Sequence, residues 1–163
     1  MKKVLIVEDE ILARLGLRQL VDWKKLELEL LPDATDGEEA LEMIRNSCPD
    51  IILLDLNIPK VSGLEILEFL KKEEMPTKVI VVSCQEEFDV VKKAMKLGAY
   101  DYLRKLNLSS DELENILEKC LGETEERITV HMQGIREIRY EEIVRDSRDI
   151  LAGACNYQTL ICI

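Results

Sequence analysis

Residues 49–63 read PDIILLDLNIPKVSG, and this stretch decides the fold. Four consecutive apolar residues, Ile51 to Leu54, end at Asp55, and the run is too short for a helix. Continuous runs of Ile, Leu and Val of this length are typical of strands buried on both faces, as in parallel sheets covered by helices. The sequence therefore predicts a buried parallel strand that ends at a carboxylate.

Three further apolar runs are followed by polar residues in the same way. They are Val4–Val7 before Glu8 and Asp9, Val79–Val82 before Ser83, and Ala99–Leu103 shortly before Lys105. The segments between the runs have helical spacing, and alternating strand and helix signals imply βαβ units. We expect five strands and five helices across roughly the first 122 residues.

Polar residues and glycine mark several helix ends. Asp36 precedes the acidic pair Glu38 and Glu39, and Ser109 precedes a second acidic turn, as N-cap residues do. Gly98 follows a helical segment, where a C-terminal glycine is common.

The chain has 163 residues and a formal net charge of -11. This length favours one domain with an extension, and we expect a domain over 1–122 followed by a linker or incomplete output region over 123–163. The negative charge argues against unaided binding to nucleic acid or anionic lipid, because Lys and Arg supply most phosphate affinity.

The sequence predicts a cytoplasmic protein without a membrane partner. The apolar stretch after Met1 is too short for a signal peptide, and no run reaches the length of a membrane span. The five cysteines, at positions 48, 84, 120, 155 and 162, include no closely spaced pair. Their odd number leaves one without a disulfide partner, which favours reduced thiols. A metal site built from them and His131 is disfavoured.

The polar residues after the strands predict a metal site. In an open parallel sheet, ligands gather at the carboxyl ends of strands where the strand order reverses. The order 2-1-3-4-5 would bring Asp9 and Asp55 together there. Packing these acids beside Glu8 would be unfavourable unless a cation neutralised them, and hard oxygen ligands suit Mg²⁺.

A metal beside a free carboxylate is what a phosphoryl acceptor requires. The carboxylate attacks phosphorus while positive charge offsets the transferring oxygens. Lys105 would supply a compact cation for the phosphate, and Ser83 would donate its hydroxyl to another oxygen.

Taken together, these residues resemble the receiver domains of two-component response regulators. The motifs that carry the resemblance are VLIVEDE (4–10), PDIILLDLNIPKVSG (49–63), VIVVS (79–83) and LGAYDYLRK (97–105). The resemblance implies a flavodoxin-like, doubly wound α/β fold with a five-stranded parallel sheet of order 2-1-3-4-5. It also implies a phosphoacceptor signalling domain that promotes only its own phosphorylation and dephosphorylation and is not otherwise an enzyme.

The resemblance implies a role for each acid at the sheet edge. Asp55 is expected to be phosphorylated. Asp9, Asp55 and the Asn57 carbonyl are expected to bind Mg²⁺, with Glu8 assisting through water.

Further residues are expected to bind the phosphoryl group or respond to it. Ser83 and Lys105 would contact phosphate, and Tyr102 would swing inward as Ser83 engages it. This movement would change the face formed by the fourth helix, fifth strand and fifth helix. Asn57 and Gln85 would tune hydrolysis.

The resemblance also implies partners. We expect phosphate from a sensor histidine kinase, a homodimer of the phosphorylated form, and DNA contact only through an output domain absent from this chain. Asp22–Trp23 and the stretch 86–89 resemble receivers that precede AraC-type DNA-binding domains, which predicts transcriptional control.

One residue departs from the family pattern. Leu106 stands where the family usually has a proline after a cis bond. A cis bond before a non-proline residue costs about 2.5–4 kcal/mol, so a trans bond with a displaced Lys105 stands as an alternative to the cis bond of the family.

Two alternatives remain at this point. Leu106 would fit an interaction module that has lost phosphorylation. A haloacid-dehalogenase-like phosphatase also uses an aspartyl nucleophile, but Asn57 stands where its second Asp belongs. A P-loop enzyme is disfavoured because no Gly-x-x-x-x-Gly-Lys run exists.

The remainder of the chain has weaker patterns. Residues 123–127 are charged like a linker or a helix continuation, 128–132 alternate like a strand, and 135–151 are loosely helical. The apolar end at 159–163 suggests a fragment of a longer output region.

Overall fold

The computed structural model describes residues 1–84 and 88–122. The expectations for Gln85, for His131 and for all of 123–163 lie outside these residues, and the proposed boundary after 122 stays a prediction.

The core of the fold is a five-stranded parallel sheet. Its strands are β1 (Lys2–Val7), β2 (Leu28–Leu30), β3 (Ile51–Leu54), β4 (Lys78–Ser83) and β5 (Asp101–Arg104). They lie in the order β2-β1-β3-β4-β5, and every neighbouring pair is parallel. The predicted strand order is confirmed, and the reversal of order falls between β1 and β3.

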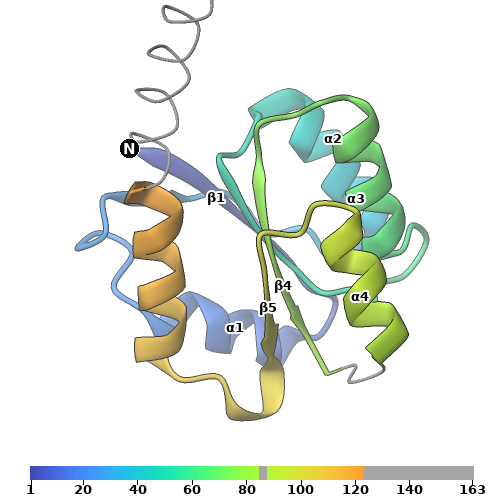
Figure 1. Ribbon diagram of the computed structural model, residues 1–163. Coiled ribbons are helices and arrows are strands. Elements are labelled where there is room, and N and C mark those ends of the chain that lie inside the picture. Colours follow the sequence, from blue (N-terminus) through green and yellow to red (C-terminus); the bar gives the residue numbers. More distant parts are fainter. Residues whose placement is uncertain (85–87, 123–163) are drawn as a thin grey trace, which may run out of the picture. The chain divides into compact units, whose positions relative to one another are not determined.

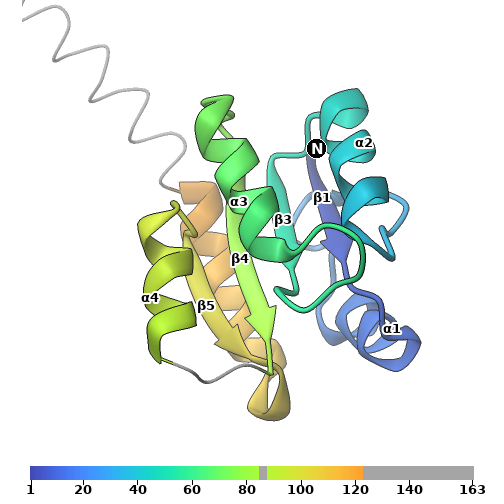
Figure 2. The ribbon, with the colours of Figure 1, turned by 90° about the vertical axis from the view of Figure 1, so that its right-hand side faces the viewer.

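Helices cover both faces of the sheet. They are α1 (Ile11–Leu20), α2 (Gly37–Ser47), α3 (Gly63–Lys72), α4 (Phe88–Lys96) and a helix over 110–122. α2, α3 and α4 lie on one face, and α1 and the helix that begins at residue 110 lie on the other (Figure 1; Figure 2). Because both faces are covered, all four residues of β3 are buried, as their apolar run predicts.

The register of the central strands positions the residues that follow them. Val7 of β1 pairs with Leu54 of β3, and the Asp55 amide donates to the Val7 carbonyl at 3.0 Å. Glu8 and Asp55 therefore emerge side by side at the carboxyl edge.

The predicted helix ends are confirmed by their hydrogen bonds. The Asp36 carboxylate accepts from the Glu39 amide at 2.9 Å, and the Ser109 hydroxyl accepts from the Glu112 amide at 3.2 Å. Gly98 follows α4 with a φ of 101°, a left-handed conformation that glycine adopts at low cost.

The fifth strand begins two residues later than its apolar run indicates. The Ala99 amide donates to the Ala94 carbonyl at 3.1 Å, so Ala99 completes the end of α4 instead of pairing with β4. The first ladder residue is Asp101, opposite Ile80.

The first helix exposes most of its large apolar residues. Ile11, Leu12 and Leu15 are 63%, 76% and 49% exposed, whereas Leu17 is buried. Their spacing predicts the helix correctly, yet these three side chains do not face the sheet.

Among the described residues, no helix has both the length and the apolar character needed to cross a membrane.

Candidate functional site

A pocket of about 370 Å³ opens at the carboxyl edge of the sheet, where the strand order reverses. It is lined by Glu8, Asp9, Glu10, Asp55, Asn57, Ser83, Cys84 and Lys105. The structure therefore gathers the sequence-predicted acids, hydroxyl and lysine in one place. Glu8, Asp55 and Ser83 are the buried polar residues of the described chain.

Three carboxylates form the acidic part of the pocket. Ligand atoms from Glu8, Asp9 and Asp55 all lie within 4.8 Å of one another. Glu8 and Asp55 are buried, whereas Asp9 is exposed. Clustered carboxylate oxygens with one open side suit Mg²⁺, which binds hard oxygen ligands and retains several waters. The donor set therefore fits the predicted metal.

Lys105 contacts the acidic cluster from the turn that follows β5, whereas the acids follow β1 and β3. Its Nζ lies 2.5 Å from Asp55 Oδ2 and 2.6 Å from Glu8 Oε2. The residue begins a short 3-10 turn, Lys105–Asn107, directly after β5. No cis peptide bond occurs among the described residues, so the bond before Leu106 is trans. The trans bond does not displace Lys105, because the turn directs its long stem to Asp55.

Burial and ion pairing shift the pKa of the groups that meet there. Burial raises the pKa of Glu8 above 4.5, although hydrogen bonding to Lys105 acts in the opposite direction. For Lys105, burial acts to lower the pKa, but the bonds to Asp55 and Glu8 outweigh it and the pKa is raised. Lys105 is therefore a permanent cation at neutral pH.

The loop after β3 fixes the Asp55 side chain. The Asn57 amide donates to Asp55 Oδ1 at 3.2 Å, and the Gly63 amide donates to the Leu56 carbonyl at 3.1 Å. Ser62 caps α3 with a capping box, in which its hydroxyl accepts from the Glu65 amide at 3.3 Å. The loop thus holds Oδ1 of Asp55, and Oδ2 is directed at Lys105.

Ser83 and Tyr102 lie on neighbouring strands near the site. Ser83 ends β4 opposite Arg104, and its side chain is fully buried in the pocket wall. Tyr102 is opposite Val81 and packs partly buried against the core. Both placements accord with the predicted phosphate and switch roles, which stay predictions. Gln85 lies outside the described residues.

Two residues near the acids were missed at the level of sequence. Cys84 lines the pocket, and Arg14 donates to the carbonyls of Glu8 and Asp9. A basic residue in the first turns of a helix is too common to single out. Only its position four residues after Glu10, on the helix that follows the acids, could have pointed to Arg14.

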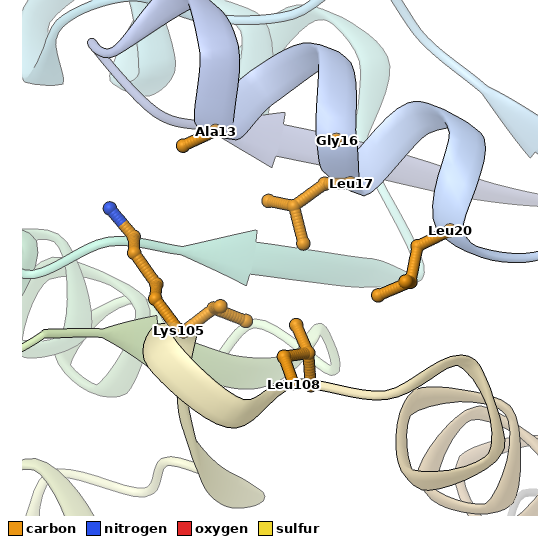
Figure 3. A pocket seen from close by; sticks show the side chains of 7 residues that line it. Ala13, Gly16, Leu17, Leu20, Lys105 and Leu108 are labelled. Atoms are coloured by element: carbon orange, nitrogen blue, oxygen red, sulfur yellow. The ribbon is translucent and has the colours of Figure 1, made fainter.

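A second, apolar hollow of about 210 Å³ adjoins the site. Figure 3 shows Leu17 and Leu20 of α1 facing Leu108, with the Lys105 stem beside them. Lys105 thus lines both hollows, and its stem packs on apolar surface while its ammonium group meets the acids.

The comparison with known families decides the identity of this domain. The family model described as the response regulator receiver domain matches residues 4–118. The chain belongs to this family. Receiver domains of this family are signalling domains of two-component systems, and the pocket occupies the sheet edge that the predicted strand order indicated.

The curated relatives are longer proteins. An uncharacterized response regulatory protein of Staphylococcus epidermidis is 34% identical over 118 residues, which cover 72% of this chain and 46% of the relative. The nitrate/nitrite response regulator protein NarL of Escherichia coli is 32% identical over 120 residues, which cover 74% of this chain and 55% of NarL. The matched part of the receiver chain thus spans about half the length of these relatives.

Solved receiver structures share the fold. The REC domain of AraT, a response regulator from Geobacillus stearothermophilus, matches with a TM-score of 0.70 and 32% identity, over 77% of this chain and 97% of that one. The flavodoxin-like fold is confirmed, while the AraC-type output stays a prediction.

Proposed function

We propose that this receiver domain accepts a phosphoryl group on Asp55 and acts as a phosphorylation-controlled switch. The contact of Lys105 Nζ with Asp55 Oδ2, inside a cluster that also holds Glu8 and Asp9, carries the proposal. A buried carboxylate with one fixed oxygen, a cation and neighbouring metal-type ligands is arranged for nucleophilic attack on phosphorus.

The proposed step transfers a phosphoryl group from a phosphohistidine. An Asp55 carboxylate oxygen forms a bond to phosphorus, the P–N bond breaks, and the histidine nitrogen takes the electron pair and then a proton from water. Bound Mg²⁺ would supply positive charge to the phosphoryl oxygens. Asp9, Asp55 and the Asn57 carbonyl would hold it, and Glu8 would assist through water.

Lys105 and Ser83 would then bind the product. Lys105 is already at Asp55 and would exchange a carboxylate oxygen for a phosphoryl oxygen. The Ser83 hydroxyl would donate to another oxygen, and Tyr102 on the adjacent strand would move inward. The face built by α4, β5 and the helix from residue 110 would shift in population, and Asn57 and Gln85 would set the hydrolysis rate.

The proposed donor is a sensor histidine kinase. Ile11 and Leu106, which follow the pocket residues Glu10 and Lys105 in the chain, are exposed apolar side chains, as are Leu12 and Leu15 on α1. Large exposed apolar groups, where they lie together, mark surfaces that bind protein. The output would be transcriptional control in the cytoplasm, through a DNA-binding domain. A homodimer of the phosphorylated form would carry the signal.

The interaction-module alternative depended on Leu106 alone. Because Lys105 reaches Asp55 with Leu106 in place, this residue no longer favours a loss of phosphorylation.

Intact mass spectrometry tests the proposal. Wild type and Asp55→Asn are incubated with acetyl phosphate, with Mg²⁺ or with a chelator. We expect a gain of one phosphoryl group in wild type with Mg²⁺ and none in the other three samples. Equal uptake by Asp55→Asn would remove Asp55 from its proposed role.

A further inference from the structure

Within the turn that carries the acids, the Glu10 amide donates to Glu8 Oε1 at 3.1 Å. Glu10 is the N-cap of α1 but makes no side-chain capping bond. Asp9, in contrast to Glu8 and Asp55, is exposed. The direction of the exposed Asp9 carboxylate therefore depends on how the backbone of the turn is held.

Arg14 provides a support for this backbone. Its Nη1 donates to the Glu8 carbonyl at 2.9 Å and to the Asp9 carbonyl at 3.3 Å. Its Nε, a different donor of the same guanidinium group, lies 3.7 Å from Asp33 Oδ2. A planar guanidinium with five donors can bind two carbonyls and a carboxylate at once, which an ammonium group cannot do in the same geometry.

Asp33 is itself tied to the sheet. The next residue, Ala34, donates its amide to the Ile6 carbonyl at 2.9 Å, and its carbonyl accepts from the Glu8 amide at 3.0 Å. Asp33 also pairs with Arg18 Nη1 at 2.5 Å. The acid turn is thus connected through Arg14 to an anchor that is bonded to β1.

We propose that Arg14 is a positioning residue that holds the Glu8–Asp9 turn in the geometry required for Mg²⁺ binding. This inference rests on the proposed function, because it takes the acid cluster as the metal site. Groups that orient metal ligands from the second layer commonly change metal affinity by about 10–100-fold when they are removed.

Arg18 provides a matched control. It lies one helical turn further along α1 and pairs with the same Asp33, whereas Arg14 alone of the two donates to the carbonyls of the acid turn. Arg14→Met and Arg18→Met remove the same charge from the same helix. Arg14→Lys keeps the charge and loses the planar fork.

The test measures Mg²⁺ affinity by isothermal titration calorimetry, with the melting temperature of each variant as a check of folding. We expect the Kd for Mg²⁺ to rise roughly tenfold in Arg14→Met and Arg14→Lys and to stay close to wild type in Arg18→Met. The Mg²⁺ concentration for half-maximal labelling by acetyl phosphate should rise equally, with an unchanged rate at saturating Mg²⁺. A structural role alone would lower the melting temperature and leave that half-maximal concentration in place.

Two results would overturn the inference. If wild type binds Mg²⁺ and is labelled, but the Arg14 variants bind Mg²⁺ as tightly as Arg18→Met, the inference fails and the proposed function stands. If wild type neither binds Mg²⁺ nor is labelled, both fail together. Should Arg14→Met not fold, Arg14→Lys decides.

Discussion

Lys105 Nζ lies 2.5 Å from Asp55 Oδ2, so the loop after β5 supplies the counter-ion of the carboxylate that follows β3. The same ammonium group pairs with Glu8 at 2.6 Å. One protein cation thus pairs with two buried acids. Lys105 and Mg²⁺ are therefore expected to share the task of neutralising the cluster.

Removal of Lys105 should make the protein dependent on Mg²⁺ for stability. Lys105→Met leaves Glu8 and Asp55 buried without their cation, and we expect a loss of about 1–3 kcal/mol in Mg²⁺-free buffer, less than for a fully enclosed pair because the pocket opens to water. Added Mg²⁺ should stabilise the variant more than wild type, since ligand that binds only the folded state raises its stability. Urea unfolding with and without Mg²⁺ measures both effects.

Lys93→Met is the control for this prediction. Lys93 pairs with Glu68 at 3.4 Å on the exposed surface, where ion pairs contribute about 0–1 kcal/mol. An identical Mg²⁺ effect on wild type, Lys93→Met and Lys105→Met would show that Lys105 does not share the neutralising role.

The cap of α2 should make stability depend on pH in the acid range. The Glu39 amide and the Lys60 ammonium lower the pKa of Asp36 below 3.8. Because this pKa is lower in the folded protein, the unfolded chain takes up the proton first as the pH falls. The stabilisation by the ionised Asp36 carboxylate is therefore present above pH 3.8 and is lost as the pH falls through the folded pKa. Asp36→Asn keeps a good capping residue and cannot titrate.

We therefore expect wild type to exceed Asp36→Asn in stability at neutral pH, and the gap to shrink as pH falls below 3.8. Urea unfolding of both proteins from neutral pH into the acid range measures this gap. A gap that stays constant across that range would show that the Asp36 charge contributes nothing.

Two glycines should respond in opposite directions to the same substitution. A Cβ at Gly63 would lie 2.5 Å from the Asp55 carbonyl oxygen and 2.6 Å from the Leu56 Cα, both backbone atoms beside the phosphoacceptor. Gly63→Ala should therefore destabilise by about 1–3 kcal/mol, as overpacking does, and should slow labelling of Asp55.

A Cβ at Gly16 in α1 would meet no neighbouring side chain or strand within 4 Å. Gly16→Ala should therefore stabilise by about 0.5–1 kcal/mol through helix propensity alone. Thermal unfolding and the rate of acetyl phosphate labelling check the pair. Stabilisation by Gly63→Ala would contradict the close approach of α3 to the Asp55 loop.

The sheet and its polar edge could be predicted because buried parallel strands leave a strong signal. Ile51–Leu54 is apolar throughout, and the residue after it must emerge at the ligand edge. β2 was not located from the sequence, since Leu28–Leu30 is a three-residue edge strand with one exposed acid at its centre.

Properties that depend on tertiary packing were not accessible from sequence. The spacing of Ile11, Leu12 and Leu15 predicts a helix but not that these side chains face solvent. The reach of Lys105 depends on the turn over 105–107, and the role of Arg14 depends on Asp33, which lies beyond the helix in the chain. Both are contacts between distant segments with no local pattern.

The most direct test of the central claim locates the phosphoryl group on the chain. Wild type labelled with acetyl phosphate and Mg²⁺ is reduced with borohydride, which converts an aspartyl phosphate to homoserine, and is then digested and sequenced by mass spectrometry. We predict homoserine at position 55 and aspartate at position 9. Homoserine elsewhere with aspartate intact at 55 would contradict the assignment of Asp55 as the phosphoacceptor.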